Sequence, residues 1–278
     1  MTPSVSLSLF DAPEKAPVLF SDNIEKNIPH IAELGYRGVD LFVENPSAEV
    51  SIKAPALLEA YGLEVGVVMP AALAGKGLYF GDEDPSVRDQ IVKESLPIIE
   101  YAAELGAMVS LGLVRGSMGK EDTPEKFMGR FSDSILRILP RAQELGVDLL
   151  IEPINRYEIN TLNGSNEAYD FIEESGLPLY LMLDTFHMNI EDVSIDESFR
   201  YCRERVRHVH FLDSNRLAPG MGHLDMIGIL KTLHEIGYTG HLCLEALPKP
   251  DFETCAQKGA EFFRKAAAAG VLGNKKRS

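Results

Sequence analysis

Four polar residues end four apolar runs in the second half of the chain, and their types suit a divalent metal ion. The runs VDLLIE, LYLMLD, VRHVH and HLCLE end at Glu152, Asp184, His210 and Glu245. These residues follow one another at intervals of 32, 26 and 35 residues, and one strand with its covering helix takes about 30 residues in a parallel α/β repeat. Each is therefore expected to end one strand of a parallel sheet. Three carboxylates and one imidazole favour Mn²⁺, Mg²⁺, Co²⁺ or Zn²⁺ over thiolate-binding metals.

Eight short apolar runs, separated by helical patterns, predict the elements that position these residues. We expect strands at about 5–10, 38–43, 64–69, 107–113, 147–152, 179–184, 206–212 and 241–246. Glycines such as Gly146 and Gly176 precede these runs, as expected where a helix ends and the chain turns into a strand. Asp84 and Thr123 each stand before a proline, a pattern typical of a helix start.

The order of these elements predicts an α/β fold, a single (β/α)8 TIM barrel. A closed barrel gathers the carboxyl ends of its strands around one mouth, so it brings the four polar residues together. A doubly wound open sheet is the alternative, and it would spread them along an edge. No linker or change in composition divides the sequence, so we expect one domain over 1–278, with a frayed tail at 271–278.

Composition excludes several classes of protein. The formal net charge is −15, from 42 acidic and 27 basic residues, which disfavours nucleic acid as a partner. No apolar run reaches the 18 residues of a membrane span, and the first residues lack a secretory pattern. Three cysteines are too few for a disulfide framework. We expect a cytoplasmic location, no membrane partner, and a homo-oligomer, either a dimer or a tetramer.

The segments that follow the strands resemble those of a known family. EPINRYE, DTFHMN, HFLDSNR and LEALP are similar to the ketose 3-epimerases of the xylose isomerase-like barrel superfamily. The run GLVRG at 112–116 and the loop SNRLAPGMGH resemble a narrower branch, the 5-keto-L-gluconate epimerases. The resemblance implies a xylose isomerase-like TIM barrel with one bound divalent ion, usually Mn²⁺.

Site residues follow from the same resemblance. It implies that Glu152, Asp184, His210 and Glu245 are the metal ligands. It also implies that Glu152 and Glu245 form the catalytic acid/base pair. The contacts to substrate oxygens would come from Glu158, His187 and Arg216.

The chemistry of epimerisation explains these residue types. Inverting a carbon next to a ketone needs two acid/base groups on opposite sides of that carbon. It also needs positive charge at the ketone and hydroxyl oxygens, to stabilise the enediolate. The expected function is therefore metal-dependent epimerisation of a keto-sugar or keto-sugar acid, of the 5-keto-L-gluconate or D-tagaturonate type.

Arg115 bears on the charge of the substrate. The chain has no tryptophan, whereas many ketose epimerases stack the sugar on one near the fourth strand. Arg115 stands at that place, and an arginine there predicts a substrate with a carboxylate, which it would bind bidentately. The alternative is that Arg115 pairs with a loop residue such as Glu121 or Asp122.

Other functions remain open on the same barrel. A neutral-ketose 3-epimerase, a sugar isomerase and an inosose dehydratase share the ligand set. An endonuclease IV-like enzyme would need histidines after the second and third strands, where the sequence reads FVE and VMP. A sugar-binding protein without catalysis would have no need of both glutamates. His208 shares a face with His210 and is expected to pack inside the barrel or support a ligand. The segment 69–81 matches no family motif.

Overall fold

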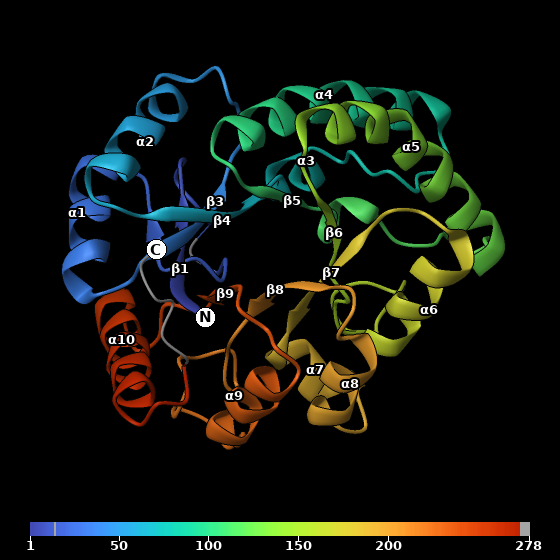
Figure 1. Ribbon diagram of the computed structural model, residues 1–278. Helices are drawn as coiled ribbons and strands as arrows, with labels where there is room; N and C mark the ends of the chain where they lie inside the picture. Colours follow the sequence, from blue (N-terminus) through green and yellow to red (C-terminus); the bar gives the residue numbers. More distant parts are fainter. Residues whose placement is uncertain (14, 273–278) are drawn as a thin grey trace.

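Parallel strands close into a barrel in the computed structural model, which describes residues 1–13 and 15–272 (Figure 1). Hydrogen bonds join the barrel strands in chain order, and β1 pairs with β9 to complete the ring. This closure confirms the predicted (β/α)8 barrel over the doubly wound sheet. The barrel strands are β1 (Thr2–Ser8), β3 (Gly38–Phe42), β4 (Glu64–Met69), β5 (Met108–Ser110), β6 (Leu149–Ile151), β7 (Tyr180–Asp184), β8 (Val206–His210) and β9 (His241–Leu244).

Helices form a ring outside the strands (Figure 1). Both predicted caps are confirmed, because Asp84 and Thr123 accept hydrogen bonds from the first turns of α4 (Pro85–Glu104) and α5 (Pro124–Leu145). Three short elements follow β4, β5 and β7 at the carboxyl ends: α3 (Ala71–Gly75), the 3₁₀ turn η1 (Leu113–Arg115) and α7 (Thr185–Glu191). The longer helices are α1 (Ile24–Leu34), α2 (Glu49–Ala60), α4 (Pro85–Glu104), α5 (Pro124–Leu145), α6 (Ser165–Ser175), α8 (Ile195–Cys202), α9 (Met226–Glu235) and α10 (Phe252–Ala268).

The first strand differs from its prediction. It runs over Thr2–Ser8 rather than 5–10, because its ladder with β9 begins at Thr2. Beyond Val5 that ladder ends, and a two-residue strand that was not predicted, β2 (Phe20–Ser21), pairs with Leu7 and Ser8 instead. The described residues between β1 and β2 lie at the mouth of the barrel, where residues 10–13 and 16–18 line the main cavity.

The barrel interior is unusually polar. Side chains inside such barrels are mostly bulky and apolar, yet Ser4, Ser6, Asp40 and His208 are all completely buried here. The expectation that His208 packs inside the barrel is confirmed. The polar interior lies directly below the strand ends that carry the site.

Two further expectations concern the surface and the tail. Among the helices of 1–13 and 15–272, none is long and apolar enough to cross a membrane. The frayed tail predicted at 271–278 lies mostly outside the described residues. Leu272, which is described, is buried, and its carbonyl accepts a hydrogen bond from the amino group of Met1.

Candidate active site

The four predicted strand-end residues meet at the carboxyl end of the barrel. Asp184 and His210 are the last residues of β7 and β8, and Glu152 and Glu245 directly follow β6 and β9. All four are buried, and one ligand atom from each lies within 4.8 Å of the others. His210 Nδ1 lies 3.3 Å from Glu152 Oε1, 3.7 Å from Glu245 Oε2 and 3.8 Å from Asp184 Oδ2. The imidazole nitrogen therefore faces three carboxylates at once.

The electrostatics of this cluster favour a cation between its members. Among the described residues, Asp184 Oδ2 and His210 Nδ1 have no hydrogen-bond partner, although both atoms are buried. Burial raises the pKa of the Glu245 carboxyl to about 7. The negative charges of Glu152 and Asp184 raise it further, while His210 and Arg216 lower it. Burial opposes protonation of His210, but the surrounding carboxylates raise its pKa well above the usual value. The donor set and its excess negative charge fit a divalent ion.

Asp184 uses its two carboxylate oxygens differently. Its Oδ1 accepts a hydrogen bond of 2.7 Å from the backbone N–H of Phe186 and so caps α7, while its Oδ2 points at the cluster. Burial opposes ionisation, but His187, His210 and Arg216 hold the pKa of Asp184 below its usual value. Capping a helix and facing a metal are thus compatible at this position.

A cavity of about 490 Å³ opens above the cluster, which is within the usual range for small-molecule sites. Of the four cluster residues, Glu152 and Glu245 line it, whereas Asp184 and His210 lie beneath. Three residues with predicted substrate contacts, Glu158, His187 and Arg216, also line it. The rest of the wall is mainly apolar and includes Phe10, Val18, Phe42, Met69, Val114 and Ile154. The segment 69–81, which no motif explained, therefore supplies part of the wall through Met69 and α3.

Arg216 links two of the acidic residues of the cavity. Its guanidinium donates to Glu158 Oε1 and to Glu245 Oε2, both at 3.0 Å, and lies 5.2 Å from the centre of the Phe186 ring. Its backbone is left-handed, with φ of 59°, a strained conformation of the kind found at functional sites. Its Nε is buried without a partner in the described chain.

His187 is oriented by a residue that the sequence analysis did not single out. Asn155 donates from Nδ2 to His187 Nδ1 at 2.8 Å and to Glu158 Oε1 at 2.8 Å. Because the amide group is a donor, Nδ1 is an acceptor and the ring proton sits on Nε2. That N–H points toward the cluster, 3.7 Å from Asp184 Oδ2. Asn155 lies in the EPINRYE motif, so only its motif could have marked it.

The predicted role of Arg115 is wrong. Its side chain is completely buried and is absent from the described cavity wall. It donates from Nε to Thr161 Oγ1, from Nη1 to the Glu152 carbonyl and from Nη2 to the Thr161 carbonyl. The alternative pairing is wrong as well, because Asp122 pairs with Arg130. The η1 turn directs the guanidinium toward Thr161 and the carbonyl of Glu152, and the side chain does not reach the cavity.

Asp40 is a second residue that the sequence analysis missed. It comes from β3, is completely buried, and contacts both His208 and His210. Burial opposes its ionisation, but the two imidazoles hold its pKa far below the usual value. A charged residue inside the apolar run GVDLF was the signal available in the sequence.

Comparisons with known proteins agree with this geometry. The family model described as "Xylose isomerase-like TIM barrel" matches residues 28–266. A ketose 3-epimerase of Arthrobacter globiformis is 31% identical over 234 residues, which cover 81% of this chain and 78% of that protein. A 3-dehydro-D-guloside 4-epimerase of Escherichia coli K12 is 27% identical over 81% of this chain and 88% of its own length.

A solved structure shows the same architecture. The D-psicose 3-epimerase of Clostridium cellulolyticum H10, solved with D-tagatose, superposes with a TM-score of 0.79 at 20% identity, over 98% of this chain and 99% of that one. At that identity the likeness establishes the fold alone. The sequence matches carry the assignment further: the chain is an isomerase that belongs to the xylose isomerase-like TIM barrels and, within them, to the ketose 3-epimerase family.

Proposed function

We propose that this chain is a divalent-metal-dependent epimerase that inverts the carbon next to the ketone of a neutral ketose. The observation that carries this proposal is that the four cluster residues differ in their access to the cavity. All four face one point, but only Glu152 and Glu245 also reach the cavity. These two glutamates can touch a substrate, whereas Asp184 and His210 can only hold an ion.

The two glutamates supply the proton transfers. One removes the proton from the carbon next to the ketone, and the other returns a proton to the opposite face. A divalent ion held by Glu152, Asp184, His210 and Glu245 would polarise the ketone and hydroxyl oxygens and stabilise the negative charge on them. With the ion bound, its charge would disfavour protonation of both glutamates, so at neutral pH each would start as a base.

Charges in the cavity favour a neutral substrate. Among the described lining residues, Arg216 is the only lysine or arginine, and both of its terminal nitrogens already contact carboxylates. Acidic residues line the same wall, namely Asp11, Glu152, Glu158 and Glu245. Apart from the ion, a substrate carboxylate would find no arginine or lysine on the described wall that is not already paired with a carboxylate. We therefore place neutral ketoses ahead of 5-keto-L-gluconate and D-tagaturonate.

Solvent isotope exchange tests the proposal. The protein, stripped with EDTA and reloaded with Mn²⁺, is incubated in D₂O with D-psicose, D-tagatose and D-tagaturonate, and the products are read by NMR after the Mn²⁺ is chelated. We expect deuterium at C3 together with the C3 epimer of the neutral ketoses, and no exchange in the stripped protein. An aldose product with deuterium at C2, together with deuterium at C1 of the recovered ketose, would indicate an isomerase. Turnover of the ketouronate alone would overturn the neutral substrate.

A further inference from the structure

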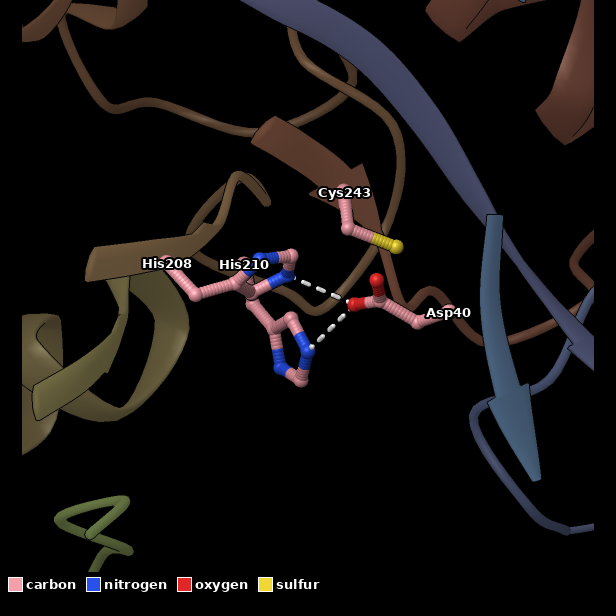
Figure 2. A group of neighbouring side chains, drawn as sticks. All are labelled: Asp40, His208, His210 and Cys243. Atoms are coloured by element: carbon pink, nitrogen blue, oxygen red, sulfur yellow. Dashed lines mark hydrogen bonds and ion pairs between the residues drawn. The ribbon is translucent and has the colours of Figure 1, made fainter. Parts of the chain in front are cut away.

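A second buried cluster lies below the four strand-end residues, inside the barrel. It consists of Asp40, His208, His210 and Cys243, and it shares His210 with the site above. Figure 2 shows both imidazoles directed at one oxygen of the Asp40 carboxylate, with the sulfur of Cys243 near it. Because Asp40 is on β3 and the histidines are on β8, which do not pair, the contact crosses the barrel.

Hydrogen bonds join the Asp40 carboxylate to both histidines of this cluster. Asp40 Oδ2 lies 2.6 Å from His208 Nε2 and 3.2 Å from His210 Nε2, and Asp40 Oδ1 accepts from the backbone N–H of Val67 at 3.2 Å. The layer is also tightly packed, since a Cβ added at Gly66 would lie 2.7 Å from Asp40 Oδ1. Both imidazoles therefore meet the same anionic oxygen through Nε2.

We propose that Asp40 is a positioning residue that fixes His210 in its metal-binding tautomer. A carboxylate can only accept, so Nε2 of His210 must carry a proton, and in the neutral, metal-binding form of the ring Nδ1 carries none. The Nδ1 atom then presents its lone pair to Glu152, Asp184 and Glu245. Three carboxylates would otherwise attract a proton onto Nδ1, and that proton would occupy the place of the ion.

The substitution Asp40→Asn would reverse this arrangement. The backbone N–H of Val67 needs an acceptor, so the amide oxygen of the new side chain would face Val67. Its NH₂ group would then face the two Nε2 atoms and donate to them. His210 would be left with its proton on Nδ1, directed at the carboxylates. Loss of a carboxylate that supports a ligating histidine typically lowers metal affinity about 10–100-fold.

The test rests on the proposed metal-dependent function and measures binding as well as turnover. Mn²⁺ affinity is determined by chelator competition for the wild type, Asp40→Asn and the control Cys243→Ala. The control removes the buried thiol next to Asp40 and keeps the Asp40 carboxylate and both imidazoles of the cluster. We expect affinity to fall about 10–100-fold in Asp40→Asn and to stay unchanged in Cys243→Ala.

A second measurement does not depend on the variant. In wild-type protein labelled with ¹⁵N-histidine and loaded with ¹¹³Cd²⁺, the metal should couple to His210 Nδ1, with the proton on Nε2. Coupling to Nε2 would overturn the inference, even if Asp40→Asn fails to fold. Equal affinity in Asp40→Asn and wild type, or equal losses in both variants, would also overturn it. A wild type that binds no divalent ion would overturn the proposed function with it.

Discussion

Replacing Arg115 by methionine should destabilise the protein without changing its choice of substrate. The guanidinium is completely buried and makes hydrogen bonds of 3.1, 3.0 and 2.8 Å to Thr161 Oγ1, the Glu152 carbonyl and the Thr161 carbonyl. Arg115→Met keeps an unbranched stem but removes all three donors. The two carbonyls receive no other hydrogen bond from the described chain.

The magnitude follows from those two acceptors. A buried acceptor left without a donor costs about 1–3 kcal/mol, so the pair costs about 2–6 kcal/mol. Burial lowers the pKa of Arg115 to about 10, although the charges of Glu152 and Glu167 raise it. Desolvation of the guanidinium therefore cancels part of the stabilisation that its hydrogen bonds provide. Removing that charge brings the expected net loss to about 2–4 kcal/mol. For a chain of this length, the melting temperature should fall by roughly 5–15 °C.

The assay compares Arg115→Met with Arg137→Met, whose arginine makes an exposed ion pair with Asp89 on the outer helices. Thermal unfolding should place the control within about 1 kcal/mol of the wild type. Turnover by Arg115→Met should fall equally on neutral ketoses and on a ketouronate, because Arg115 holds the backbone of Glu152 rather than a substrate. Unchanged stability with a loss confined to the ketouronate would refute this reasoning.

Four further outcomes are expected. Asp184→Asn should bind markedly less Mn²⁺ by metal analysis while keeping its fold, because an asparagine oxygen can still cap α7; full metal content would place the ion elsewhere. Glu245→Gln should abolish C3 epimerisation in the NMR assay, and normal turnover would show that Glu245 transfers no proton. Gly112→Ala would put a Cβ 2.5 Å from Glu152 Oε2 and so displace that carboxylate. We expect kcat to fall by roughly tenfold or more, which corresponds to about 1.4 kcal/mol in activation free energy; an unchanged kcat would mean that Glu152 tolerates the displacement. The pKa of Glu245 is raised to about 7 in the ion-free protein, so this ligand is protonated below that pH. Because the ion must displace that proton, metal affinity measured by chelator competition should fall about tenfold per unit of pH below 7. An affinity independent of pH would contradict this.

The strand ends could be predicted from the sequence because each closes an apolar run. Glu152, Asp184, His210 and Glu245 stand at the ends of strands β6 to β9, and the barrel brings together residues that are 32, 26 and 35 positions apart. The first strand was harder to place, since its serines alternate with apolar residues and its start depends on pairing with β9, more than 200 residues away. A two-residue strand such as β2 leaves no periodic pattern at all.

Side-chain direction could not be predicted from the sequence. Arg115 follows the strand next to that of Glu152, as expected, but η1 turns its guanidinium toward the carbonyls of Glu152 and Thr161. Asp40 could equally have faced the helices, and only the closed barrel shows that it meets His210 across the interior. Both outcomes depend on local backbone geometry and on contacts between strands that do not pair.

The double use of the Asp184 carboxylate restricts which residues can occupy that position. Asparagine or serine could cap α7 but would bring no negative charge to the cluster, and glutamate would bring the charge on a side chain too long for the Asp184 contact to Phe186. Only aspartate combines both roles. A lineage that gave up catalysis could accept asparagine here and still fold, so position 184 offers one substitution by which an enzyme of this kind could become a sugar-binding protein.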